Sequence, residues 1–134
     1  MILYFSTLLI ALILSWVNLS SADCIKETGL QERDVPKNFE ALPNATETYK
    51  CFVKCLMEEA GILQNGEFRL DKAAEEWKQD SVYKTNLPKM LEIGNSCKLL
   101  KGENDCKQAF NINVCILQKA AEVFPVVKDE FNLE

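Results

Sequence analysis

Between its glycines and prolines, the chain shows mainly the three- and four-residue spacing of apolar positions that is typical of amphipathic helices. This spacing is clearest from Glu47 to Ala60, which predicts a helix. We expect three further long helices and two short ones, with almost no strand. Their expected positions are a helix through Leu70–Trp77 behind the candidate cap Asp71, a helix from Asn86 to Lys101–Gly102 where the glycine adopts the left-handed conformation, a helix from Asn104 or Asp105 to before Pro125, and short helices around Cys24–Thr28 and Lys37–Ala41.

The first 22 residues carry no charged side chain and hold an apolar run that ends at Ser20, Ser21 and Ala22. This pattern predicts a signal peptide (residues 1–22) that is cleaved after Ala22, followed by one secreted, extracellular domain (residues 23–134). The alternative is a membrane anchor, which needs about 20 unbroken apolar residues. Asn18 interrupts the run too early for that, so we expect no stable membrane insertion after cleavage.

The predicted mature domain keeps all 15 basic and 20 acidic residues, so its net charge stays at −5. An acidic surface argues against nucleic acid as a partner. The chain has no histidine, which removes the commonest general base and the serine and cysteine triads. Adjacent acids such as Glu58 and Glu59 point about 100° apart on a helix, so a solvated face explains them better than glycosidase chemistry. We predict no enzyme, no metal site and no cofactor.

Six cysteines, all downstream of the leader, predict a disulfide framework in a secreted protein. Cys51 and Cys55 lie about 40° apart on one helix and should reach different partners. Cys106 and Cys115 are nine residues apart and point in opposite directions on a continuous helix. Excluding these two pairs leaves ten of the fifteen possible connectivities open.

The cysteine spacing resembles that of the insect odorant-binding proteins of the six-cysteine pheromone-binding and general odorant-binding type. Three residues separate the second and third cysteines, and eight separate the fifth and sixth, as in that family. The segment Ala60–Phe68 also resembles the family's link between its third and fourth helices. The resemblance implies an all-α fold of about six helices around an apolar cavity, with the bridges Cys24–Cys55, Cys51–Cys106 and Cys97–Cys115.

The resemblance also implies which positions line the cavity. Carried over by position, the ligand-binding residues are Met57, Ile62, Phe68, Leu87, Met90, Leu91, Ile116 and Phe124, with Val53, Leu63, Trp77 and Leu117 as further candidates. Some relatives place hydroxyl groups near the region of Met57 and Ile62 to hold small alcohols. This chain has none there, which points to a more apolar ligand.

We therefore expect a secreted carrier, a monomer or weak homodimer, that transports a small hydrophobic ligand such as an odorant, pheromone or lipid-like metabolite through extracellular fluid to an olfactory receptor. The main alternative is a secreted helical interaction protein with a solid core, such as a cytokine-like, seminal or salivary factor. A small secreted hydrolase is a second alternative, which the missing histidine disfavours.

Two features have open interpretations. The chain after Cys115 either covers the cavity as a lid or caps the core as a last helix turn. Asn44-Ala45-Thr46 is an N-glycosylation acceptor, but Asn44 also stands three residues before Glu47, as in a capping box. We favour the cap over the glycan.

Overall fold

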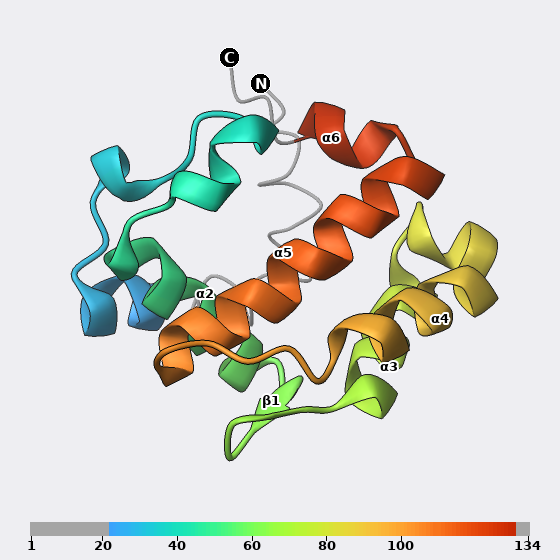
Figure 1. The fold of residues 1–134 in the computed structure, drawn as a ribbon, viewed down its shortest axis with the longest axis horizontal. Coiled ribbons are helices and arrows are strands. Elements are labelled where there is room, and N and C mark those ends of the chain that lie inside the picture. Colours follow the sequence, from blue (N-terminus) through green and yellow to red (C-terminus); the bar gives the residue numbers. More distant parts are fainter. Residues whose placement is uncertain (1–21, 131–134) are drawn as a thin grey trace.

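The computed structural model describes residues 22–130 (Figure 1), and the predictions for residues 1–21 and 131–134 lie outside that range. The predicted all-helical class, stapled by three disulfides, is confirmed within it. None of the helices in this part is long and apolar enough to cross a bilayer.

The centre of the molecule is a pair of packed helices, α2 (Glu47–Glu59) and α5 (Asp105–Val123). α5 crosses the middle of the view in Figure 1. It begins where the sequence predicts, because the Asn104 side chain accepts a hydrogen bond from the Lys107 amide at 2.8 Å and so caps the first turn. It ends before Pro125, also as predicted.

A second layer is formed by α3 (Leu70–Gln79), the 3-10 helix η3 (Tyr83–Asn86) and α4 (Leu87–Cys97). α3 packs on α4, and α4 packs on α5. Asn86 caps α4 as predicted, accepting from the Lys89 amide at 3.4 Å. This layer stands on the side of α5 that is opposite the N-terminal segments in Figure 1.

Short elements connect these helices. Residues 22–28 are helical, as predicted, while the expected short helix around Lys37–Ala41 is the 3-10 helix η2 (Phe39–Asn44), preceded by η1 (Glu32–Asp34). The link after α2 forms a small hairpin that the helical periodicity did not predict, made of β1 (Leu63–Gln64) and β2 (Glu67–Phe68). The chain turns through Asn65 and Gly66, both with positive φ, as a two-residue hairpin turn of type I′ requires. The last helix is α6 (Val126–Glu130).

The three disulfides join the pairs that the family resemblance implied: Cys24–Cys55, Cys51–Cys106 and Cys97–Cys115. The first ties residues 22–28 to α2, the second ties α2 to α5, and the third ties α4 to α5. Cys51 and Cys55 thus reach different segments, as helix geometry predicted.

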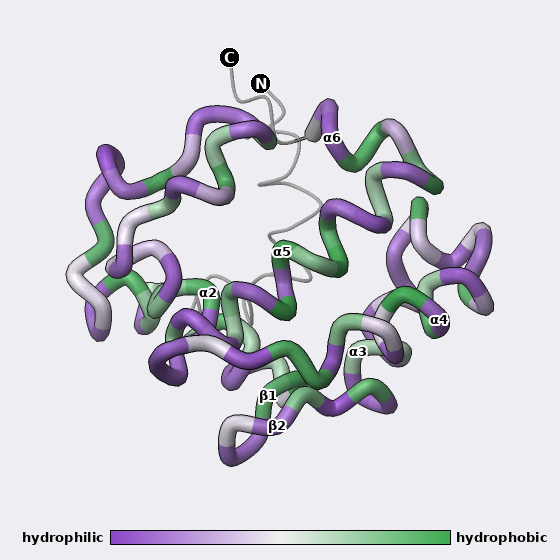
Figure 2. The backbone as a smooth tube through the Cα atoms, viewed as in Figure 1, coloured by the Kyte–Doolittle hydropathy of each residue, from purple (hydrophilic) through white to green (hydrophobic). Residues whose placement is uncertain are grey.

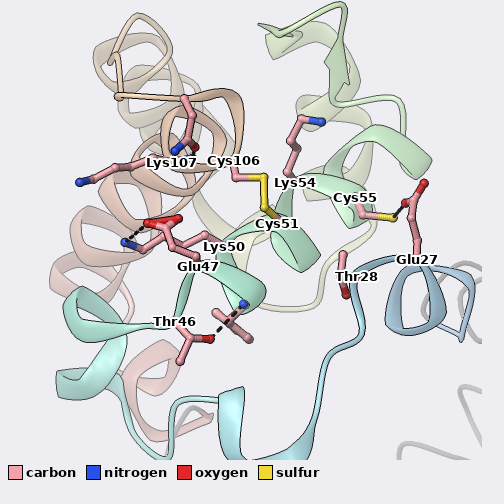
Figure 3. The surroundings of a disulfide bond; sticks show 12 residues. Glu27, Thr28, Thr46, Glu47, Lys50, Cys51, Lys54, Cys55, Cys106 and Lys107 are labelled. Atoms are coloured by element: carbon pink, nitrogen blue, oxygen red, sulfur yellow. Dashed lines mark hydrogen bonds and ion pairs between the residues drawn. A yellow bond between two sulfur atoms is a disulfide. The ribbon is translucent and has the colours of Figure 1, made fainter.

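Three predicted helix ends are wrong, because a residue that suits a helix end does not by itself fix where the helix begins or stops. Thr46, not Asn44, caps α2, and its hydroxyl accepts from the Tyr49 amide at 3.2 Å (Figure 3). Asp71 lies inside the first turn of α3, where its carboxylate suits the helix dipole. α4 ends at Cys97, before Lys101 and Gly102.

The core contains only apolar side chains among the described residues. Along α5, hydrophobic and hydrophilic residues alternate (Figure 2), as they do in a helix with one apolar face. α5 packs against α2 and α4. The largest fully buried side chains include Leu42, Met90 and Ile112.

Candidate functional site

A mainly apolar pocket of about 140 Å³ lies among α2, the hairpin link, α3, η3 and α5. Five segments of the chain thus supply its wall, and they are brought together by the packing of α5 on α2 and of α3 on α4. Its lining residues are Met57, Ile62, Phe68, Ala73, Trp77, Tyr83, Asn113, Ile116 and Leu117. None of these side chains is charged, so the pocket favours uncharged, largely apolar molecules.

The hairpin positions one side of this wall. Antiparallel pairing sets Leu63 directly opposite Phe68, and both side chains are buried. Phe68 therefore faces inward at the end of a two-residue strand, with Leu63 packed beside it. The backbone amide of Arg69 donates to the Ile62 carbonyl, which closes the link between α2 and α3.

A close approach of α3 to α4 positions Trp77 in the opposite wall. A Cβ atom added at Gly94 would lie 2.9 Å from the indole Cη2 of Trp77 and 2.6 Å from Leu70 Cδ1. No larger residue fits at position 94 without a shift of these side chains. Tyr83 then stands edge-on to Trp77, with the ring centroids 6.5 Å apart, and meets Phe124 on its other side at 5.7 Å.

Four of the eight residues predicted to bind ligand line the pocket, and so do two of the further candidates. These are Met57, Ile62, Phe68 and Ile116, with Trp77 and Leu117. The other four predicted residues lie in or against the core beside the pocket: Met90 is fully buried, while Leu87, Leu91 and Phe124 are half-buried. Val53 and Leu63 are also core residues. Ligand contact by any of these residues stays a prediction.

Sequence reasoning missed three lining residues, Ala73, Tyr83 and Asn113. Asn113 carried a signal, because it interrupts the apolar stripe of α5 between Ala109 and Ile116. Ala73 lies on the predicted apolar face of α3, but its small side chain does not reveal whether it borders a void. Tyr83 lies in a 3-10 helix that has no apolar periodicity to place it.

Two carboxyl groups with lowered pKa lie outside this pocket. A hydrogen bond from Lys128 lowers the pKa of Glu40, which lies on η2. For the exposed Asp71, slight desolvation acts to raise the pKa, but the hydrogen bond and charge of Arg69 outweigh it and leave the pKa below its ordinary value. Neither residue lines the pocket.

Larger hollows on the surface are lined by charged side chains. One of about 440 Å³ lies beside the Cys51–Cys106 bridge and is bordered by Glu27, Glu47 and Lys54 (Figure 3). Water competes strongly for such charged groups, so this hollow suits an apolar ligand less well than the inner pocket.

Near this hollow, the Glu27 carboxylate approaches the Cys55 sulfur at 3.0 Å, and with Cys24 the three groups have the spacing of metal ligands. The two sulfurs, however, are bonded to each other. They therefore provide no thiolates for a metal ion.

Comparison with known proteins places the chain in a family. The PBP/GOBP family model matches residues 17–119. In Drosophila melanogaster, general odorant-binding protein 56a is 31% identical over 99 residues, which are 69% of this chain and 64% of that protein. General odorant-binding protein 28a of the same fly is 30% identical over 107 residues, 75% of this chain and 73% of that one. The chain thus matches just under two thirds of the length of the first relative.

Solved structures show the same fold. Odorant-binding protein dmelOBP28a from Drosophila melanogaster aligns with a TM-score of 0.61 at 27% identity, covering 83% of this chain and 94% of that one. Fatty acid binding protein OBP56a from the oral disk of the blowfly Phormia regina aligns with a TM-score of 0.61 at 22% identity, covering 79% and 90%. The family-model match, the cysteine pairing and the fold agree, and the chain belongs to the PBP/GOBP family.

Proposed function

We propose that the protein is a secreted, non-catalytic carrier that binds a small hydrophobic molecule in the pocket among α2, α3 and α5. It transports this ligand through aqueous extracellular fluid to a receptor, and it acts as a monomer or a weak homodimer. The observation that supports this proposal most strongly is the uncharged lining of the pocket. An apolar ligand that binds there gains free energy by leaving water, and no charged lining residue has to lose its hydration.

Family membership supports the same function. The relatives are described as general odorant-binding proteins, and one structural neighbour as a fatty acid binding protein. That neighbour is only 22% identical, so fatty acids enter here as ligands to be tested.

The size of the pocket limits the affinity. At about 140 Å³ it is close to cavities of about 150 Å³ that hold one benzene molecule. Burying roughly eight methylene-sized groups at about 0.8 kcal/mol each contributes about 6 kcal/mol, and the cost of association reduces this. A ligand of this size therefore binds no more tightly than some tens of micromolar. Chains of 8 to 18 carbons need the pocket to widen, and the cost of widening offsets part of what each extra buried methylene contributes.

The test is displacement of a fluorescent apolar probe, combined with mass spectrometry of an organic extract of the native protein. We expect probe binding with a dissociation constant below about 100 μM, and a retained apolar compound in the extract. Failure of the probe and of every medium-chain alcohol, ester or fatty acid to bind in that range contradicts the carrier function and favours the solid-core interaction protein.

A matched pair of variants locates the binding. Ala73 lines the pocket and is 1% exposed, while its neighbour Ala74 does not line it. Ala73→Leu should fill part of the pocket and weaken probe binding at least tenfold, whereas Ala74→Leu should leave it unchanged. Equal effects of both variants would place the bound probe elsewhere.

A further inference from the structure

The pocket contains one side-chain amide in an otherwise apolar helix face. On α5, Asn113 follows Ala109 by four residues and precedes Ile116 by three, and both neighbours are buried. An apolar residue is expected at such a position. A polar side chain kept there needs a hydrogen-bond partner, since an unpaired amide in an apolar setting is costly.

Within residues 22–130, the Asn113 side chain has no hydrogen-bond partner. Among the described residues, no side-chain nitrogen or oxygen that is inaccessible to solvent lacks a hydrogen-bond partner. The unpaired amide of Asn113 is therefore accessible to solvent, and Asn113 lines the pocket. An amide both donates and accepts, so it pairs with a hydroxyl, a carbonyl or an ester oxygen.

From these observations we infer that the pocket selects compact, uncharged molecules that carry one oxygen function, and that Asn113 is the residue that recognises this oxygen. This inference rests on the proposed carrier function and specifies its ligand class. The pocket volume of about 140 Å³ sets the size at roughly six to eight non-hydrogen atoms. Because no lining residue is cationic, an ionised carboxylate has no counter-charge there and is disfavoured.

The experiment compares four ligands of one shape: toluene, benzyl alcohol, benzaldehyde and benzoate. Trp77 lines the pocket, and removal of residues 1–22 leaves it as the only tryptophan of the secreted protein, so its fluorescence reports binding at this site. For the wild-type protein at pH 7, benzaldehyde and benzyl alcohol should bind at least tenfold more tightly than benzoate. Benzoate binding as tightly as the alcohol overturns the inference without any variant.

Variants at position 113 test the role of the amide. Asn113→Leu and the smaller Asn113→Ala should lower the preference for benzyl alcohol over toluene by roughly 3- to 10-fold, the effect of one neutral hydrogen bond. Gln118→Leu, at an exposed position on the same helix, should leave this ratio unchanged. Asn113→Leu should also keep or raise the melting temperature. If Asn113 served only to stabilise the fold, its replacement would lower the melting temperature.

The outcomes separate the two proposals. If no tested ligand, fluorescent probe or hexadecanoate binds, the carrier function itself fails. If toluene binds well, and the ratio of the affinities for benzyl alcohol and toluene is the same in the wild type and in both variants, the carrier function stands and the role of Asn113 is wrong. Hexadecanoate binding more tightly than every compact ligand overturns the size limit alone.

A second, independent observation concerns Asn44. The sequence favoured a capping role for its side chain, but Thr46 caps α2 instead. Asn44 is exposed at the end of η2, and its side chain has no hydrogen-bond partner within the described residues. We propose that Asn44, in the acceptor Asn44-Ala45-Thr46, carries an N-linked glycan, because neither burial nor capping competes for its amide nitrogen.

This proposal is tested on protein secreted from insect cells with its own leader. Peptide mapping after treatment with a peptide N-glycosidase in heavy-oxygen water should label position 44. Asn44→Gln should lose the glycan, while Thr46→Ser should keep both the glycan and the helix cap. Unmodified Asn44 in the secreted protein, or a protein that never enters the secretory pathway, overturns the proposal and leaves the ligand-binding results untouched.

Discussion

The two halves of α5 are held in the protein by different forces. The first half, Asp105 to Cys115, carries two disulfides, one to α2 through Cys106 and one to α4 through Cys115. The second half carries none. It is held by apolar packing and by α6, whose Lys128 bonds Glu40 on η2 at 2.9 Å with both side chains more than half exposed.

The pocket lies where these two halves meet. Asn113 belongs to the covalently fixed half, while Ile116 and Leu117 belong to the packed half. Packing and an exposed ion pair give way at lower free energy than a crosslink does. We therefore expect the pocket to widen on the side of α6 when it admits a larger ligand, while the wall that contains Asn113 stays in place.

Loss of both α5 disulfides together has the largest expected effect. In the chain-entropy estimate, the Cys51–Cys106 bridge, with a sequence separation of 55, contributes about 4 kcal/mol, and Cys97–Cys115, with a separation of 18, contributes about 3 kcal/mol. Paired alanine variants should lower the free energy of unfolding in that order. Urea denaturation measures this, and a larger loss from the shorter loop would contradict the account.

Core truncation on either side of the boundary should give unequal losses. Phe110 is buried in the first half, edge-on to Tyr49 with the ring centroids 6.0 Å apart, and Phe110→Ala should cost about 4 kcal/mol. Val127 of α6 is equally buried, but Val127→Ala removes less surface and should cost about 2 kcal/mol.

Hydrogen exchange distinguishes the two responses. Val127→Ala should speed exchange mainly in α6 and the end of α5, because this half opens locally. Phe110→Ala should speed exchange throughout the chain. Uniform exchange in both variants would show that the two halves open together and would remove the distinction between them.

The cap of α2 has a smaller expected effect. Thr46→Ala removes the hydrogen bond to the Tyr49 amide and should cost about 1 kcal/mol. Asn44→Ala, two residues earlier, is the matched control and should change the free energy of unfolding by less than about 0.5 kcal/mol. Thermal unfolding of unglycosylated protein measures both, and an equal loss in the control would restore the capping role of Asn44.

The ion pair of α6 should have the smallest effect, confined to low pH. A hydrogen bond from Lys128 lowers the pKa of Glu40 below its usual 4.5. The link is therefore present above about pH 4.5 and is lost as the pH falls through the lowered folded-state pKa. The amide signals of α6 should stay constant between about pH 7 and 6, where only histidine normally titrates, and Lys128→Met should abolish the acid transition. A transition centred near pH 6 would contradict this.

Much of the helical framework follows from local signals. Asn86 and Asn104 each precede an apolar stripe directly, and both cap the predicted helices. The ends at Asn44 and Gly102 were wrong because two or more polar or flexible residues competed for each end, and tertiary packing decided among them. At Gly102, an added Cβ would lie 2.5 Å from the backbone nitrogen of Gln108, so this glycine permits tight packing at the start of α5.

The pocket followed less directly from the sequence. Met57 and Met90 both lie on predicted apolar faces, yet Met57 lines the pocket while Met90 is packed on every side. Periodicity shows which side chains point inward, but it does not show where packing between those side chains leaves a cavity. That depends on the way α3 approaches α4 at Gly94, which is a property of the assembled fold.

The most direct test of the carrier function is a crystal structure of the protein soaked with 4-bromophenol, with the bromine located by its anomalous scattering. We expect one strong bromine peak among Met57, Phe68 and Trp77, with the hydroxyl oxygen within hydrogen-bond distance of the Asn113 amide. A bromine peak only in the charged surface hollow beside Cys51–Cys106, or no peak at all, would contradict this expectation.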